Sequence, residues 1–220
     1  MAGDVSPREA IASICHVVPE HELGLYAVDG MAPKVVAYPK TAEQVAEIVR
    51  VAAAHRWAVI PRGGGTIIEL GGIPRAVDVV ICTTDMNRML EYEPADLTCT
   101  VQAGMRLSEL QARLSEHGQF LALDPPLPDK ATIGGIVAAN SSGPLRLRYG
   151  TCRDLLIGVR VVNPDGSITK GGGKVVKNVS GYDMCKLYTS SLGTIGIILE
   201  ATFKLWPLPA CESTVVASYP

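Results

Sequence analysis

The chain has 220 residues, of which 47% are apolar, and its 20 basic residues nearly balance its 22 acidic ones. This length and composition allow one sizeable domain or two small ones with a buried core, and they give no sign of nucleic acid as a partner. The N-terminus lacks a secretory signal pattern, and no apolar stretch reaches the roughly 18 residues that a membrane-spanning helix requires. We therefore expect a cytoplasmic protein with no membrane span.

The cysteines and histidines of the sequence form no metal or nucleophile motif. None of the six cysteines belongs to a CxxC pair, so a zinc or iron–sulfur site within the chain is not expected. We interpret these cysteines as reduced and mostly buried. The four histidines are dispersed, and neither HExxH nor GxSxG occurs.

The first predicted elements form a β-α-β unit. "KVVAYP" (34–39) favours a strand, and "WAVIP" (57–61) is the continuous apolar run expected of a buried parallel strand. Between them, residues 41–55 repeat apolar side chains at helical spacing after a capping box of Thr41 and Gln44.

Strands and short helices continue to the end of the chain. A helix over 106–118 is predicted to begin with a second capping box, Ser108 with Gln111. "NPDG" joins two β runs into a hairpin over 155–172. The remaining predicted elements are strands at 77–82, 97–104, 120–123 and 195–209, and helices at 131–143 and 183–193. With a soft boundary near 85–96, this pattern predicts two lobes of mixed α and β structure.

Two glycine triplets distinguish the sequence. "PRGGGT" (61–66) directly follows a predicted strand, where open α/β units place their ligand loops. It does not fit GxGxxG, because Ile68 stands at the third glycine position, so an NAD-binding Rossmann fold is not supported. Successive N–H groups beside Arg62 make a sound anion cradle, although a tight turn explains the loop equally well. The second triplet, in "GGGK" (171–174), lacks the P-loop pattern and is interpreted as a turn or loop.

Two further segments are rich in small residues. "DPPLPDKATIGGIVAANSSG" (124–143) leads into a helix start at Thr132, where free N–H groups favour an anion. Packing against a sheet does not by itself explain two glycines in a first helical turn, since each is disfavoured by ~1 kcal/mol relative to Ala. "SLGTIGIILE" (191–200) places two more glycines before a strand. Three such sites predict one long ligand that lies across both lobes.

These segments, in this order, resemble the FAD-binding domain of the vanillyl-alcohol oxidase and p-cresol methylhydroxylase type over about residues 35–206. "RYGTCRDLLIGVRVVNPDG" extends the likeness, and "KNVSGYD" with "SLGTIGIILE" is similar to the FAD-binding subunit of bacterial glycolate oxidase. The resemblance implies an α+β fold with a cofactor cleft between two lobes. We expect a leader (1–33), a first lobe (34–90), a second lobe (91–210) and a tail (211–220).

The resemblance also implies positions that bind FAD. The loop that would surround the pyrophosphate consists of Pro61, Arg62, Gly63, Gly64, Gly65 and Thr66. The cleft wall would consist of Pro125, Pro126, Thr132, Gly134, Gly135, Asn140, Ser141 and Gly143, with Tyr149 and Gly150 close by. Gly196 and Ile197 would contact the isoalloxazine or ribityl region. Asn178, Tyr182 and Asp183 fit a structural turn as well as a direct contact.

Two departures from the family pattern matter. Several relatives attach FAD covalently through a histidine that ends the glycine loop; Thr66 stands at that position here, which implies non-covalent FAD. Relatives also carry a substrate-binding cap domain after the FAD domain, whereas this chain ends at Pro220. We expect no cap in this chain, either because it is a fragment or because the substrate surface comes from elsewhere. No catalytic residue is therefore assigned.

The implied function is that of a glycolate oxidase-like subunit. FAD would accept a hydride equivalent from the CH–OH group of a small 2-hydroxy acid. Electrons would then pass to partners, which the resemblance implies are a second flavoprotein subunit and an iron–sulfur subunit, and the chain alone would be a poor enzyme. Two alternatives remain: the cofactor domain of a D-lactate-type FAD dehydrogenase, and a non-catalytic subunit that carries FAD for structure or electron relay.

Overall fold

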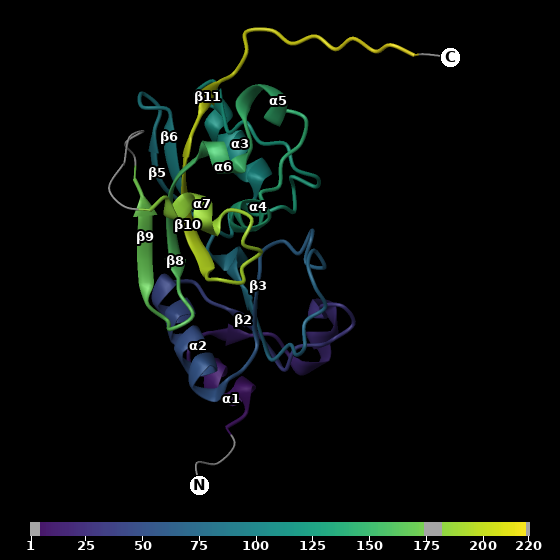
Figure 1. Cartoon of the computed structure of the whole chain (residues 1–220), viewed down its shortest axis with the longest axis vertical. Coiled ribbons are helices and arrows are strands. Elements are labelled where there is room, and N and C mark those ends of the chain that lie inside the picture. The colour runs from purple at the N-terminus through teal and green to yellow at the C-terminus, as the bar shows by residue number, and fades with distance from the viewer. Residues whose placement is uncertain (1–4, 174–181, 219–220) are drawn as a thin grey trace.

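The computed structural model describes residues 5–173 and 182–218 and contains two lobes, each built on its own sheet. The first lobe lies at the N-terminal end of the long axis and the second lobe at the other end (Figure 1). The predicted α+β, two-lobed fold is confirmed. Asn178 lies outside the described residues.

The sheet of the first lobe has the strand order β1-β2-β4-β3. Its strands are β1 (His16–Val17), β2 (Val35–Tyr38), β3 (Val59–Arg62) and β4 (Val79–Cys82). β2 and β3 both run parallel to β4, as predicted for the β-α-β unit, while β1 is antiparallel to β2. β4 is buried throughout, but every residue of β3 is only partly buried. The prediction that this strand is buried was wrong, because β3 has a neighbour on one side only.

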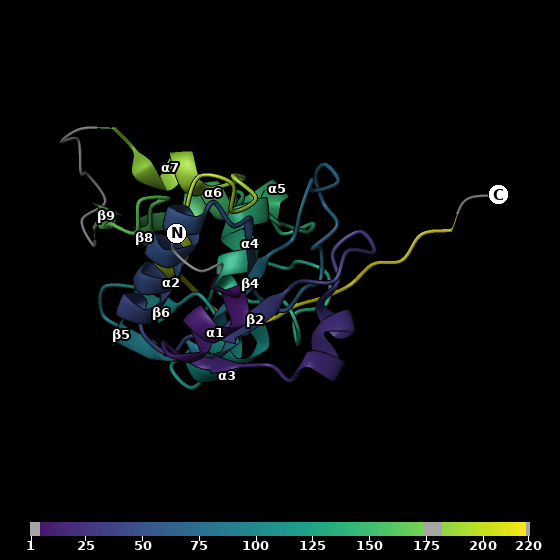
Figure 2. The ribbon, with the colours of Figure 1, turned by 90° about the horizontal axis from the view of Figure 1, so that it is seen from below.

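Helix α2 (Ala42–His55) begins where the capping pattern predicted. The Thr41 hydroxyl accepts a hydrogen bond from the Gln44 N–H at 3.2 Å, and Gln44 Oε1 accepts one from the N–H of Lys40 at 2.7 Å. The reciprocal bond is therefore displaced by one residue from the usual capping box. α1 (Pro7–Ala12) and α2 pack together on one face of the first sheet, as the view from below shows (Figure 2).

Residues 18–31 cover the other face of this sheet. The 3-10 helix η1 (Glu20–Tyr26) lies there, and Leu23 and Tyr26 pack on a cluster that includes Val36 and Val80. Since β1 also pairs with β2, the described part of this segment packs as a component of the first lobe.

The second lobe is built on an antiparallel sheet with the order β5-β6-β10-β8-β9. Its strands are β5 (Met89–Glu93), β6 (Thr98–Gln102), β8 (Leu156–Val162), β9 (Ile168–Gly172) and β10 (Ile197–Lys204). The predicted hairpin forms, with the Gly166 N–H donating to the Asn163 carbonyl at 2.9 Å. Because β9 extends to Gly172, Gly171 and Gly172 lie in a strand, and their interpretation as a loop was wrong.

Helix α3 (Leu107–Ser115) begins without the predicted capping box. Its N-cap is Arg106, and the N–H groups of Leu107 and Ser108 donate to backbone carbonyls of residues 131 and 128. The Gln111 side chain instead donates a hydrogen bond to the Leu121 carbonyl and accepts one from the Leu121 N–H. A neighbouring segment thus supplies the acceptors that a local cap would have offered.

The remaining elements are η2 (Thr83–Asp85), β7 (Gln119–Phe120), α4 (Ile133–Ala139), α5 (Arg146–Tyr149), α6 (Cys152–Leu155), α7 (Met184–Tyr188) and β11 (Trp206–Pro207).

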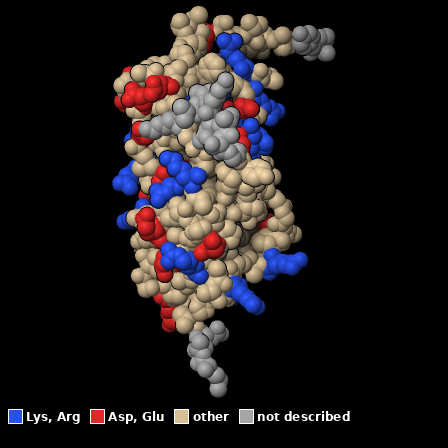
Figure 3. All heavy atoms as spheres, turned by 60° about the vertical axis from the view of Figure 1, so that its left-hand side comes forward, with Lys and Arg blue, Asp and Glu red and all other residues tan. Residues whose placement is uncertain are grey.

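The distribution of charges on the surface and the state of the cysteines agree with the amino-acid composition. Basic and acidic side chains are interspersed on the face seen in Figure 3, and residues 211–218 are exposed and extend away from the body (Figure 1). All six cysteines are free and four are buried. Burial raises the pKa of Cys99 and Cys152 to about 12, so these thiols stay protonated at neutral pH. Within the described ranges, no helix is long and apolar enough to cross a membrane.

Candidate functional site between the two lobes

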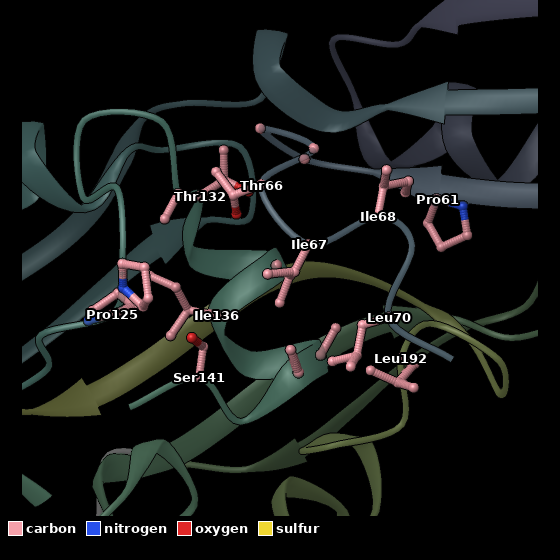
Figure 4. A pocket seen from close by; sticks show the side chains of 18 of the residues that line it. Pro61, Thr66, Ile67, Ile68, Leu70, Pro125, Thr132, Ile136, Ser141 and Leu192 are labelled. Atoms are coloured by element: carbon pink, nitrogen blue, oxygen red, sulfur yellow. The ribbon is translucent and has the colours of Figure 1, made fainter. Parts of the chain in front are cut away.

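A cleft lies where the two lobes meet. One wall is the loop that follows β3, and the other is the start of α4 with the segment before it (Figure 4). The predicted residues that line it are Pro61, Gly63, Gly64, Gly65, Thr66, Pro125, Pro126, Thr132, Gly135 and Ser141. An adjoining smaller pocket is lined by Arg62, Gly134, Gly196 and Ile197. The fold therefore brings together three segments that are far apart in the sequence.

The glycine loop touches the second lobe through bare backbone. A Cβ at Gly63 would stand 2.0 Å from Thr132 Oγ1, and one at Gly64 would stand 1.8 Å from the carbonyl oxygen of Lys130. Gly65 has φ +69°, a conformation that side chains other than glycine rarely adopt. The first two glycines are thus required by the approach of the lobes, and the third by the turn.

The same loop presents unused donors. Across the residues that the structure describes, no hydrogen bond uses the N–H groups of Gly64, Gly65 or Thr66. Consecutive N–H groups of this kind form a concavity that binds anions. The loop is therefore both a contact between the lobes and a set of free donors suited to an anion.

Thr132 is the second notable group. It is 1% exposed, and its Oγ1 has no hydrogen-bond partner within the described part of the chain. Leaving a buried hydroxyl unsatisfied costs ~1–3 kcal/mol. Because Thr132 lines the cleft, a ligand in the cleft is the natural partner for this hydroxyl.

The start of α4 differs from the expectation of free N–H groups. The N–H groups of Ile133 and Gly134 donate to the carbonyls of Met105 and Ala103 at 2.9 and 2.7 Å. A Cβ at Gly134 would stand 2.8 Å from that of Ala103, so packing does explain this glycine. At Gly135 a Cβ would meet only Thr132 Oγ1, at 3.4 Å, and this glycine faces the cleft.

The third segment is tied to α4 by backbone hydrogen bonds. The N–H groups of Ser190 and Leu192 donate to the carbonyls of Val137 and Ala138 at 3.1 and 2.8 Å. Both residues have positive φ, which is unusual for an apolar residue such as Leu192. This conformation holds the Leu192 side chain at the cleft (Figure 4).

Comparison with known proteins identifies the family. Residues 33–172 match the FAD binding domain family. The chain belongs to this family. Its cofactor is FAD, and the resemblance read from the sequence is confirmed.

Curated relatives are longer than this chain. It is 37% identical to glycolate oxidase subunit GlcD of Bacillus subtilis (strain 168), over 85% of this chain and 40% of the relative. It is 35% identical to mitochondrial D-lactate dehydrogenase [cytochrome] 1 of Saccharomyces cerevisiae, over 85% of this chain and 32% of the relative. It is 32% identical to D-2-hydroxyglutarate dehydrogenase of Stutzerimonas stutzeri, over 86% of this chain and 41% of the relative. The chain thus spans less than half the length of these relatives.

Solved structures agree with the fold. An alkyldihydroxyacetonephosphate synthase superposes with a TM-score of 0.70 and 30% identity, covering 82% of this chain and 35% of the other. BBE-like 1 of Physcomitrella patens superposes with a TM-score of 0.75 and 21% identity, covering 92% of this chain and 45% of the other. The second likeness shows the FAD-domain fold alone.

Some positions that the family resemblance implied lie outside the cleft lining. Asn140 ends α4 with φ +50° and accepts a hydrogen bond from the Arg153 N–H, and the Gly143 N–H donates to Asp124. The Tyr149 ring packs between those of Phe120 and Trp206. Gly150 ends α5 with φ +85°, Tyr182 is 97% exposed, and Asp183 caps α7. Contact of Asn140, Gly143, Tyr149 and Gly150 with FAD stays a prediction. The cap of α7 favours the structural reading of Asp183.

The cleft also contains apolar residues that were not predicted from the sequence. Ile67, Ile68 and Leu70 follow the glycine loop and, with Leu192 and Ile136, form an apolar side of the cleft (Figure 4). No motif marked them, because isolated apolar residues in a loop carry no spacing signal. Among the described residues that line this cleft, none has a charged side chain, an imidazole or a thiol.

Proposed function

We propose that this chain is the FAD-binding unit of an oxidoreductase that acts on the CH–OH group of a small 2-hydroxy acid, as a subunit like that of glycolate oxidase. The observation that carries the proposal is the cleft between the lobes, with its unused loop N–H groups and the unpartnered Thr132 hydroxyl. The similarity to a glycolate oxidase subunit, a D-lactate dehydrogenase and a D-2-hydroxyglutarate dehydrogenase supports the substrate class.

In this proposal the glycine loop holds the diphosphate of FAD. The N–H groups of Gly64, Gly65 and Thr66 would donate to phosphate oxygens, and the Arg62 guanidinium would add positive charge at the base of the loop. The Thr132 hydroxyl would gain the partner that it lacks among the described residues. Gly135 lets a flat group approach α4, and Gly196 and Ile197 line the adjoining pocket.

We propose that FAD is bound without a covalent bond. A flavin is attached to proteins through side chains such as the histidine found in several relatives, and Thr66 stands at that position. No histidine or cysteine lines the cleft among the described residues. Acid precipitation of the FAD-loaded protein tests this, because flavin that remains in the washed pellet would contradict it.

The chemistry on the substrate requires groups from outside this cleft. Bound FAD supplies the acceptor for the hydride equivalent. Removal of the hydroxyl proton needs a positioned base, and the substrate carboxylate needs a cation. No described residue that lines the cleft supplies either group. We therefore propose that other parts of the assembly complete the substrate site, and that a second flavoprotein and an iron–sulfur subunit receive the electrons. A cytoplasmic location stays a prediction from the sequence.

The test is flavin reduction in the absence of oxygen. The FAD-loaded chain is mixed with glycolate, D-lactate or D-2-hydroxyglutarate, alone and together with its co-purifying subunits, and the flavin absorbance is followed. We expect bleaching by one or more of these acids in the assembly and slow bleaching by the isolated chain. Fast turnover by the isolated chain with an artificial acceptor would show that the substrate site is already complete.

A second candidate is the cofactor segment of a D-lactate-type FAD dehydrogenase. The observation in its favour is the similar identity, 35%, to the yeast D-lactate dehydrogenase. The two candidates differ in which acid bleaches the flavin faster, glycolate or D-lactate. Absence of bleaching by every acid, even in the assembly, would favour a subunit that only carries FAD.

A further inference from the structure

The N-terminal 3-10 helix η1 reaches the glycine loop through one aromatic ring. Tyr26 is the last residue of η1, and the guanidinium carbon of Arg62 lies 5.1 Å from the centroid of its ring. This distance is within the roughly 6 Å at which an aromatic face attracts a cation. The segment before the predicted first lobe therefore contacts a residue at the start of the loop.

The same guanidinium lies against the backbone of the loop. A Cβ at Gly65 would stand 2.7 Å from Arg62 Nη2 and 2.9 Å from Cζ. With φ +69° as well, Gly65 is a position where only glycine leaves room for the guanidinium. Arg62 is thus in contact with the Tyr26 ring and with the turn of the loop at the same time.

The Tyr26 ring is itself held in place by the first sheet. The hydroxyl oxygens of Tyr26 and Tyr38 are 2.7 Å apart, and the two rings meet edge to face with their centroids 6.3 Å apart. Tyr38 belongs to β2, and Tyr26 also packs on the buried cluster that includes Val36 and Cys82. The ring is therefore a fixed support and not a mobile surface group.

No described carboxylate neutralises Arg62. Within residues 5–173 and 182–218, its guanidinium makes no ion pair and donates no hydrogen bond. Its charge lies beside Gly65, whose N–H is unused, as are those of Gly64 and Thr66 on either side of it. A cation that is held in place but left unpaired next to such donors is suited to an incoming anion.

We propose that Tyr26 is a positioning residue for the cofactor diphosphate: it holds the Arg62 guanidinium at the glycine loop before FAD arrives. This rests on the proposed function only in that FAD occupies the cleft. A long side chain that is ordered in advance loses less rotamer freedom on binding, which strengthens the complex without a new contact. Tyr26 thus acts on FAD through Arg62, and the described N-terminal segment becomes part of the cofactor site.

The test is a double-mutant cycle read as FAD affinity. The dissociation constant is measured by titration calorimetry for the wild-type chain and for Tyr26→Leu, Tyr26→Phe, Arg62→Met and the Tyr26→Leu/Arg62→Met double variant. Leu25→Ala is the matched control, since Leu25 lies in the same 3-10 helix and is 74% exposed. Circular dichroism and thermal melting report whether each variant is folded.

We expect Tyr26→Leu to weaken FAD binding about fivefold, within the range of cation–π and side-chain ordering effects. Tyr26→Phe keeps the ring face and should bind within about twofold of wild type, and Leu25→Ala should bind as wild type. Arg62→Met should weaken binding about tenfold, and adding Tyr26→Leu to it should cause no further loss.

A Tyr26→Leu loss that persists undiminished in the Arg62→Met background would overturn the proposal, because Tyr26 would then act independently of Arg62. Wild-type affinity of Tyr26→Leu would also overturn it, as would failure of the wild-type chain to bind FAD. FAD binding without reduction by any hydroxy acid would instead refute the proposed activity and leave the role of Tyr26 standing.

Discussion

The two glycine triplets have the same composition, but the structure requires glycine in each of them for a different reason. In the first, Gly63 and Gly64 touch Thr132 and Lys130 of the other lobe, beside the cleft. In the second, Gly171 lies in β9 under helix α7, where a Cβ would stand 2.3 Å from that of Met184. A Cβ at Gly172 would stand 2.1 Å from the carbonyl oxygen of Ile157. A run of glycines therefore indicates close approach, but only the fold shows whether the neighbour leaves room for a ligand.

The largest effect is expected from Gly64→Val. The new side chain would collide with the Lys130 carbonyl and separate the loop from the second lobe. We expect FAD affinity to fall at least tenfold, about 1.4 kcal/mol, and the free energy of unfolding to fall by about 3 kcal/mol. Calorimetric titration and denaturant unfolding measure the two. Gly72→Val is the control, because a Cβ at Gly72 has no neighbour within 4 Å.

Gly171→Val should separate stability from binding. Overpacking against Met184 should lower the free energy of unfolding by about 2 kcal/mol. FAD affinity should stay within about twofold of wild type, because β9 does not line the cleft. The size of the FAD-induced rise in Tm checks this directly. Equal losses of affinity at Gly64 and Gly171 would mean that the cleft is not the binding site.

Thr132→Val should change binding and stability in opposite directions. Removing the unpartnered hydroxyl should leave the FAD-free protein as stable as wild type or more so, while FAD affinity falls about fivefold. The matched control is Thr189→Val, near the second triplet, since the Thr189 hydroxyl donates to the Cys185 carbonyl at 2.7 Å. That variant should lose about 1 kcal/mol of stability and no affinity. A Thr132→Val protein that binds FAD as tightly as wild type would remove this hydroxyl from the site.

The smallest effect concerns the helix over the second triplet. Hydrogen bonds from Lys186 lower the pKa of Asp183, which caps α7. A carboxyl whose pKa is lower in the folded state stabilises the protein above its unfolded pKa of about 3.9, and this contribution is lost as the pH falls through the folded value. The Tm of Asp183→Asn should therefore lie slightly below wild type at pH 7 and converge with it in acid. FAD affinity at pH 7 should not change.

Much of the fold could be predicted because its signals are local. The apolar spacing of residues 41–55, the Thr41 cap and the "NPDG" turn each depend on neighbours in the sequence, and each forms as expected. The order of small-residue segments was sufficient to indicate the FAD-binding family. In the same way, the loop at 61–66 and the start of α4 could be assigned to one cleft before any contact was known.

The sequence by itself determined the main strands and helices, the family and the cofactor, because these depend on residue types and spacing along the chain. The tertiary structure decided which glycine triplet borders the cleft, that Gly134 serves packing, and that β3 is an edge strand. It also decided that Leu192 lines the cleft and that Tyr26 holds Arg62. These facts depend on contacts between residues that are distant in the chain, and no local propensity encodes such contacts.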